Sequence, residues 1–560
     1  MKIIKLFNFQ KIVFFISFIF LVMKVNLYYP STLSPDFVRY KSYIEYFMGF
    51  NNFINSEQGS LYFFIIFIFI FIQVKSNNLE FPDNLNNIGN QLNFNFSNIS
   101  QFEYQVGLGI QYGNIFIYLF GLFGIYKLLR LENVDKKNIF LIFTFLNFLP
   151  TTTQMILTLK PEIFAFSLLI WSIYFFEQYF KDFSNKFIYL FLVSFALLAT
   201  TKASILGMVL IFFFFKIKKT NLRSLSNLKI IKVIIILFLL TSIIFIENSS
   251  LLERSFFDRA ELNEIYNQVS YDNKATFDIF FRINFNELIF YPVKNYHANS
   301  LIGITLLDTF GDYFNEYWNK DYTFYSKFRK DFIQYSNENT LLLSEKVIKQ
   351  NLYKFNLDNL RRSISLIQSL IFYFFIFYFL IKKNYKNKLF VVSPLIGIFI
   401  LTLSSLGFPE NNFDPITGDL FKSFYYSFFI CLSFIIIINE ILSNVTVKKQ
   451  FYYLSIFILI NLFVFGFPKG NNTELDTSLI EFNRSTITCE LNKLYLKHSL
   501  IEYKNVPCIN QNYFNNLKIS SNAAKPYFSI FLFLYLILQI FIENTKKYFS
   551  IFKLNQDKRK

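Results

Sequence analysis

The chain has 560 residues, of which 53% are hydrophobic, 21% are aromatic and only 17% are charged. Uncharged apolar runs such as 363–381 and 526–542 approach the ~20 residues that a helix needs to cross a bilayer. These runs exclude an ordinary soluble protein. The net charge of +17 comes from basic residues beside the apolar runs, which indicates the positive-inside pattern and no nucleic-acid partner. Three cysteines and two histidines exclude a disulfide-rich scaffold, a cysteine-ligated cluster and a histidine metal centre.

The N-terminus carries Lys2, Lys5 and Lys11 before the apolar stretch 12–23. No cleavage pattern follows, so we expect a retained signal anchor with a cytoplasmic N-terminus. Hydropathy predicts the later spans at roughly 106–126, 138–157, 161–179, 187–201, 203–216, 231–246, 364–381, 389–407, 420–441, 451–467 and 526–543. The pair 187–201 and 203–216 is short for two spans.

The run 61–72 is strongly apolar but shorter than a span, which favours a buried, re-entrant or interfacial segment. If it does not cross, every later basic cluster falls on the cytoplasmic side; if it crosses, all of them are inverted. These clusters lie at 127–137, 181–186, 216–223, 382–388, 448–449 and 546–560. The sequence therefore predicts an all-α polytopic membrane protein with about twelve transmembrane helices, large outer loops and both termini in the cytoplasm.

This topology divides the chain into consecutive units. They are an N-terminal transmembrane module at 1–246 with a first outer loop at 29–105, a large outer-loop subdomain at 247–363, transmembrane helices at 364–467, an outer loop at 468–525, and a last helix with a basic cytoplasmic tail at 526–560. Cys489 and Cys508 share one outer loop and form either a disulfide or two unpaired thiols.

Ionisable residues are scarce in the middle of the predicted spans, where a charge is costly. Lys24, Lys160, Glu162 and Lys202 stand near outer ends. This pattern indicates chemistry on a lipid-borne substrate at the outer surface more than passage through the membrane.

The first candidate site residue is Asp36, in the segment Ser34-Pro35-Asp36 just after the first span. A carboxylate held there could act as a general base on an acceptor hydroxyl. The same residues also suit the start of a helix, with Asp36 favoured by the helix dipole, and both roles are compatible.

Two outer turns carry a predicted charged rim, Lys160 and Glu162 at the start of one span and Lys202 between two others. Snorkelling lysines and helix capping are the structural alternative. The acidic segment 408–425 brings Lys422 to the start of a span. A lysine there could stabilise the charge of a lipid-linked phosphate, or it could be a snorkelling lysine.

The large loop contains Asp308 and Asp312 among aromatic residues at 306–318. Acidic groups beside aromatic rings suit recognition of a sugar or a lipid headgroup. In the alternative interpretation, Phe310 and Trp318 anchor the loop in the membrane interface.

Together these features resemble the polytopic GT-C glycosyltransferases, such as the protein mannosyltransferases and the lipid A aminoarabinose transferase, which use polyprenyl-phosphate sugars. The resemblance covers about residues 1–440. It rests on Asp36 in the first outer loop, Lys160-Pro161-Glu162 opening a span, Thr200-Thr201-Lys202 and Lys422 with Tyr425. Three features depart from the family pattern: the first loop lacks an adjacent acidic pair, Ala203 replaces a glycine, and Lys422 stands where an Arg-Tyr pair is common.

The resemblance implies an inverting transfer of a sugar from a polyprenyl phosphate to a glycan, lipid or protein acceptor, at the periplasmic or exterior face of a bacterial inner membrane. Asp36 would activate the acceptor. The expected substrate-binding residues are Arg39, Tyr40, Lys160, Glu162, Lys202, Asp308, Asp312, Lys422 and Tyr425. No metal ligands are assigned, and a divalent cation as cofactor stays open.

Two other functions are compatible with the sequence. A surface polysaccharide polymerase or ligase would use arginines of the large loop, such as Arg254, Arg259 and Arg282. A flippase or transporter of lipid-linked sugars would need a polar groove through the spans, built from Asn, Ser and Thr.

Overall fold

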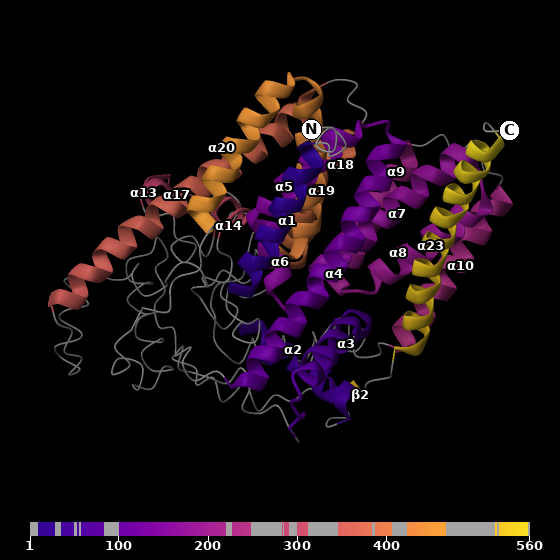
Figure 1. Cartoon of the computed structure of the whole chain (residues 1–560), viewed down its shortest axis with the longest axis horizontal. Coiled ribbons are helices and arrows are strands. Elements are labelled where there is room, and N and C mark those ends of the chain that lie inside the picture. The colour runs from indigo at the N-terminus through magenta and orange to yellow at the C-terminus, as the bar shows by residue number, and fades with distance from the viewer. Residues whose placement is uncertain are drawn as a thin grey trace.

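The structure is a computed structural model of the chain (Figure 1). It describes residues 9–27, 35–49, 53–54, 58–82, 100–219, 227–247, 283, 285–290, 300–311, 345–382, 387–405, 423–465, 521–522 and 526–557.

The described part is a helical bundle. Its helices in the first half of the chain are α1 (Phe9–Leu27), α2 (Pro35–Met48), α3 (Ser60–Ser76), α4 (Gln101–Leu131), α5 (Lys136–Phe148), α6 (Pro150–Leu157), α7 (Glu162–Asp182), α8 (Asn185–Ala199), α9 (Ala203–Lys219) and α10 (Asn227–Glu247). Those of the second half are α13 (Phe285–Phe290), α14 (Leu301–Asp308), α17 (Glu345–Ile381), α18 (Lys388–Ser405), the 3-10 helix η7 (Ser423–Tyr426), α19 (Ser427–Ser443), α20 (Val447–Phe465) and α23 (Tyr527–Asp557). Two short strands, β1 (Phe53–Ile54) and β2 (Ser521–Asn522), pair antiparallel.

A helix occupies each predicted span, with a bent pair, α5 and α6, at 138–157. Among the described residues, seven helices are long and apolar enough to cross a membrane, or eight if α5 and α6, which meet at 63°, form one broken span. The helices α3, α8, α9 and α18 are apolar but shorter. The fold is that of a multi-pass membrane protein.

Burial separates central from peripheral helices. The apolar windows of α4 and α7 are 72% and 83% buried, whereas those of α20 and α23 are 22% and 28% buried. The peripheral helices expose large apolar side chains, including Phe238 and Ile246 of α10 and Phe531 and Phe541 of α23. So much apolar surface is unfavourable in water and suits contact with lipid.

Helix α3 packs antiparallel against the first half of α4. Glycines of α4 permit the close approach, because a Cβ on Gly109 would lie 2.6 Å from the Ile70 Cα. Farther along the pair, Gln73 Nε2 donates to Gln105 Oε1 over 2.7 Å. The second half of α4 packs instead on α7, where a Cβ on Gly121 would lie 2.7 Å from the Ser167 Oγ. Helix α3 therefore lies beside only the first half of α4.

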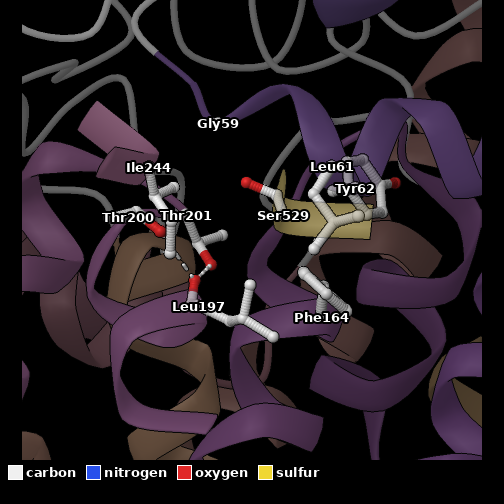
Figure 2. Close-up of a pocket in the computed structure, with 9 residues that line it drawn as sticks. All are labelled: Gly59, Leu61, Tyr62, Phe164, Leu197, Thr200, Thr201, Ile244 and Ser529. Atoms are coloured by element: carbon white, nitrogen blue, oxygen red, sulfur yellow. Dashed lines mark hydrogen bonds between the residues drawn. The ribbon is translucent and has the colours of Figure 1, made fainter. Parts of the chain in front are cut away.

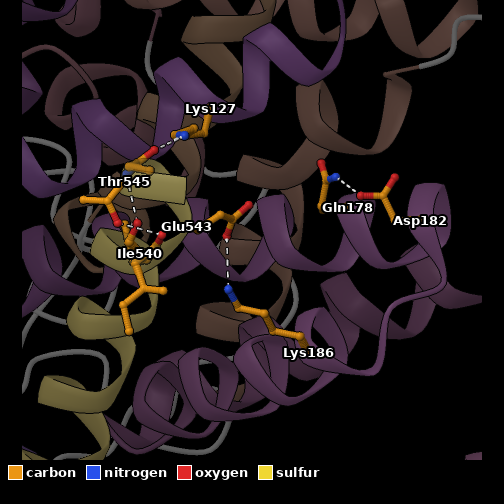
Figure 3. Close-up of polar contacts among 9 residues, drawn as sticks. Lys127, Gln178, Asp182, Lys186, Ile540, Glu543 and Thr545 are labelled. Atoms are coloured by element: carbon orange, nitrogen blue, oxygen red, sulfur yellow. Dashed lines mark hydrogen bonds and ion pairs between the residues drawn. The ribbon is translucent and has the colours of Figure 1, made fainter. Parts of the chain in front are cut away.

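The basic clusters gather at one end of the bundle. Lys186 Nζ lies 4.0 Å from Glu543 Oε2 and joins the start of α8 to α23 (Figure 3). At the same end, Lys127 donates to Asn544, Lys216 pairs with Glu177, and Lys382 pairs with Glu440. The start of α1 and the end of α23 also lie at this upper end of the bundle in Figure 1, on different sides of it. These lysines from four of the basic clusters therefore share one end of the bundle.

The approach of α3 to α4 provides a stability test. Gly109→Ala places a methyl group against the Ile70 backbone, so we expect the protein in detergent to lose about 1–3 kcal/mol of stability and melt at a lower temperature. Gly207→Ala is the control, because its Cβ would meet nothing closer than 3.6 Å. Equal melting temperatures for the two variants would contradict this packing.

Candidate functional site

Three charged side chains meet inside the bundle at the end opposite the basic clusters. Lys160 is 1% exposed, Glu162 is 0% exposed and Lys202 is 8% exposed. Lys202 Nζ lies 2.9 Å from Glu162 Oε1. The predicted rim residues are thus together, but they are buried and do not form an exposed rim.

Short turns between antiparallel helices position this cluster. Lys160 and Pro161 connect α6 to α7, and Glu162 occupies the first turn of α7, where the helix dipole favours a carboxylate. Helix α8 ends at Ala199, and the hydroxyls of Thr200 and Thr201 donate to the Ala196 and Leu197 carbonyls. Lys202 follows directly before α9 (Ala203–Lys219) and reaches Glu162 through its side chain.

Aromatic rings of η7 cover the two ammonium groups. Lys202 Nζ lies 3.8 Å from the centroid of the Tyr425 ring. Lys160 Nζ lies 5.1 Å from the Phe424 ring and 5.5 Å from the Tyr425 ring. Cation–π attraction and the Glu162 carboxylate partly replace the water that the lysines lose on burial. Tyr425 therefore lies against Lys160 and Lys202. We call Lys160, Glu162 and Lys202 the lysine cluster.

The segment before α3 is attached to the same cluster. Gln58 forms a β-bridge with Lys202, and Gly59 N donates to the Thr201 carbonyl over 2.8 Å. A Cβ on Gly59 would lie 2.4 Å from the Thr200 carbonyl oxygen, so this approach requires glycine.

Helix α2 reaches the cluster through Gln58. The Gln58 Nε2 donates to the Tyr40 Oη over 3.3 Å, and the Tyr43 hydroxyl donates to the Gln58 carbonyl. Tyr40 is thus beside the lysine cluster. Asp36 stands in the first turn of α2, four residues before Tyr40, and Arg39 precedes Tyr40 directly. The side chains of Asp36 and Arg39 lie outside the described part of the structure.

A second polar group surrounds Asp308, which is 5% exposed at the end of α14. The Thr309 hydroxyl lies 3.0 Å from the Tyr373 hydroxyl, which lies 3.4 Å from that of Tyr426. The segment is bound to α6, since the Thr151 hydroxyl donates to the Thr309 carbonyl over 2.8 Å. A segment from the middle of the predicted large loop, 300–311, thus enters the bundle. We call Asp308, Thr309, Tyr373 and Tyr426 the Asp308 group.

Phe310 belongs to the core and does not anchor the loop at an interface. It is 4% exposed, and its ring centroid lies 5.3 Å from that of Phe372. Asp312, Lys422, Cys489 and Cys508 lie outside the described residues, as does Trp318. Cys431 is a buried free cysteine of α19.

A small pocket adjoins the lysine cluster (Figure 2). Residues of α3, α7, α8, α10 and α23 line it together with Gly59 and the threonines before Lys202: Gly59, Leu61, Tyr62, Phe164, Leu197, Thr200, Thr201, Ile244 and Ser529. Beside the pocket, the Glu247 carboxylate of α10 accepts from Ser529 N over 3.0 Å and from Ser529 Oγ over 2.7 Å. This contact attaches the start of α23 to the end of α10.

Within the described ranges, no group of three or more His, Cys, Asp or Glu residues lies close enough together to hold a metal ion. The chemistry that the described cluster offers is that of paired ammonium groups, a carboxylate and aromatic hydroxyls. The sequence did not reveal Gln58, Tyr43, Tyr373 or Tyr426 as members of the site. Their polar atoms reach it through contacts between segments far apart in the chain.

The buried ion pair provides a second stability test. Glu162→Gln leaves the Lys202 ammonium buried without its counter-charge, so we expect a loss of about 3–5 kcal/mol. Lys202→Met should lower the stability much less in the Glu162→Gln protein than in the native protein. A double-mutant cycle, in which unfolding of the protein in detergent is measured, gives this coupling.

The matched control is the more exposed pair Lys216 and Glu177, whose side chains are 13% and 30% exposed. We expect its coupling to be about 1 kcal/mol or less. Additive effects of Glu162→Gln and Lys202→Met would contradict a coupled buried pair.

Comparisons with known proteins give no match to this chain among family models, curated proteins or solved structures.

Proposed function

We propose that this protein is a membrane glycosyltransferase that moves a sugar from a polyprenyl-phosphate donor to an acceptor at the outer face of the membrane. The observation that carries the proposal is the lysine cluster, in which two buried ammonium groups face one aromatic ring. Ammonium groups in a poorly hydrated place are suited to binding an anionic group, such as a lipid phosphate, through charge-assisted hydrogen bonds.

In the proposed reaction, the acceptor hydroxyl attacks the anomeric carbon of the sugar. The bond from this carbon to the phosphate oxygen breaks, and the phosphate keeps the bonding electrons. Asp36 takes the hydroxyl proton, while Lys160, Lys202 and Lys422 offset the charge that develops on the phosphate. The attachment of α2 to the cluster through Tyr40 and Gln58 supports a place for Asp36 near the reacting groups.

The remaining assignments belong to the same proposal. Arg39, Asp308 and Asp312 would contact the donor or the acceptor, and a glycan, lipid or protein acceptor fits an outer site. The surface polysaccharide polymerase or ligase and the lipid-linked sugar flippase are the competing functions. A flippase would move the donor lipid between leaflets without transferring the sugar.

The full topology is also proposed: about twelve spans, both termini in the cytoplasm and the lysine cluster at the periplasmic or exterior face of a bacterial inner membrane. Two observations support it. The basic clusters share one end of the bundle, and α3 lies beside only the first half of α4.

The function is tested by transfer of labelled sugar from polyprenyl phosphate in membranes. We expect Lys202→Met and Asp36→Asn each to lower the rate at least tenfold, because each removes a charge proposed to act in the transition state. Lys216→Met is the matched control, since Lys216 also pairs with a glutamate and lies 4.2 Å from a ring centroid, that of Phe390.

The control should retain its transfer rate when corrected for protein amount. Undiminished transfer in Asp36→Asn would remove Asp36 from the mechanism. Transbilayer movement of the donor without any transfer would instead favour the flippase.

The topology is tested with single cysteines in a background without the native ones. Glu80 follows α3 and Asn444 follows α19, and both are exposed at opposite ends of the bundle. We expect a membrane-impermeant thiol reagent to label Glu80→Cys in intact spheroplasts and Asn444→Cys only after lysis. The reverse pattern would invert the whole topology.

A further inference from the structure

Two residues that contact Lys202 each have a buried acceptor oxygen. The Oε1 of Gln58 and the Oε2 of Glu162 have no hydrogen-bond partner within the part of the chain that the structure describes. The two residues are 3% and 0% exposed. Buried polar atoms in folded proteins nearly always have hydrogen-bond partners. Two buried oxygens without a partner therefore indicate a missing hydrogen-bond donor.

Both residues are attached to Lys202. Glu162 uses its other carboxylate oxygen, Oε1, to pair with Lys202 Nζ at 2.9 Å. Gln58 is joined to the Lys202 backbone by the β-bridge. Lys202 therefore connects Gln58 and Glu162.

The Gln58 side chain is also fixed in place. Its Nε2 donates to Tyr40, its carbonyl accepts from Tyr43, and the neighbouring Gly59 is bonded to Thr201. The side-chain amide is thus held by one hydrogen bond and the backbone beside it by two. A group fixed in this way presents its other oxygen at little further cost in conformational entropy, which is the requirement for a preorganised binding group.

The chemistry of these oxygens distinguishes two parts of a ligand. An amide oxygen and a carboxylate oxygen accept hydrogen bonds from hydroxyl groups, and they repel the oxygens of a phosphate. The ammonium groups of Lys160 and Lys202 have the opposite preference. The cluster thus combines a cationic side for an anion with an acceptor side for hydroxyls.

We propose that Gln58 Oε1 and Glu162 Oε2 form a hydroxyl-binding subsite that recognises the sugar of the donor lipid next to its phosphate. This inference rests on the proposed function and adds to it the residues that distinguish a glycosylated lipid phosphate from the bare one. A site built to bind a hydroxyl discriminates strongly against a ligand that lacks it, because its own buried groups are then left unpaired.

The test uses the full-length protein in nanodiscs and three kinds of probe. These are bare polyprenyl phosphate, the same lipid carrying glucose, mannose or galactose, and the monodeoxy forms of whichever sugar binds most tightly. We expect the native protein to bind the best glycosylated lipid at least tenfold more tightly than the bare lipid. At least one monodeoxy form should lose about tenfold in affinity.

The variant Gln58→Met keeps the length of the side chain and removes the acceptor oxygen. It should bind bare polyprenyl phosphate within twofold of the native protein, but bind the glycosylated lipid about tenfold more weakly. The sensitive monodeoxy form should then bind this variant as well as the full sugar does. Gln73→Met, at the far end of α3, is the matched control and should behave as the native protein.

The outcomes separate the two proposals. If the native protein binds the bare lipid as tightly as every glycosylated form, the subsite is overturned while the phosphate site stands. If it binds neither lipid, the proposed function and the subsite both fail. If Gln58→Met also binds the bare lipid more weakly, the affinities of the native protein for the monodeoxy lipids decide. If removal of no single hydroxyl weakens binding, the subsite is overturned.

Discussion

The candidate site depends on one interaction, the buried ion pair between Lys202 and Glu162. Removing two charges from water is costly, and the pair persists because several elements share the compensation. Helix α7 provides its N-terminal dipole, η7 provides the Tyr425 ring, and the segment before α3 covers the backbone of Lys202. The pair therefore fixes the relative positions of segments that come from four separate parts of the sequence.

The 3-10 helix η7 connects the two polar parts of the bundle through adjacent residues. The ring of Tyr425 faces the lysine cluster, while the hydroxyl of Tyr426 joins the Asp308 group. The close packing of Tyr426 on α18 reinforces this placement, since a Cβ on Gly397 would lie 2.4 Å from the Tyr426 Cβ. A shift of η7 cannot move one ring without moving the other, so the two groups are mechanically coupled.

The sequence predicted the helices well because an uncharged run near the thickness of a bilayer has few other stable conformations. It also brought Lys160, Glu162 and Lys202 to neighbouring turns, since short connections keep antiparallel helices adjacent. It did not reveal that these side chains are buried, because the Tyr425 ring that covers the lysines lies more than two hundred residues farther along the chain. Gln58 and the burial of 300–311 were missed for a similar reason. Their composition is ordinary, and only long-range contacts place them.

The contact between the Glu247 carboxylate of α10 and the start of α23 has a consequence for how the chain assembles. Ser529 lies 282 residues after Glu247, so α10 is synthesised and inserted long before its partner exists. Until then, the C-terminal end of α10 carries a hydrated carboxylate, and the amides at the start of α23 supply its partners on arrival. Because Glu543 in the middle of α23 also pairs with Lys186 of α8, this helix is attached both at its start and halfway along. Insertion of α23 thus completes the wall of the pocket, and a chain that terminates early leaves that side open to lipid.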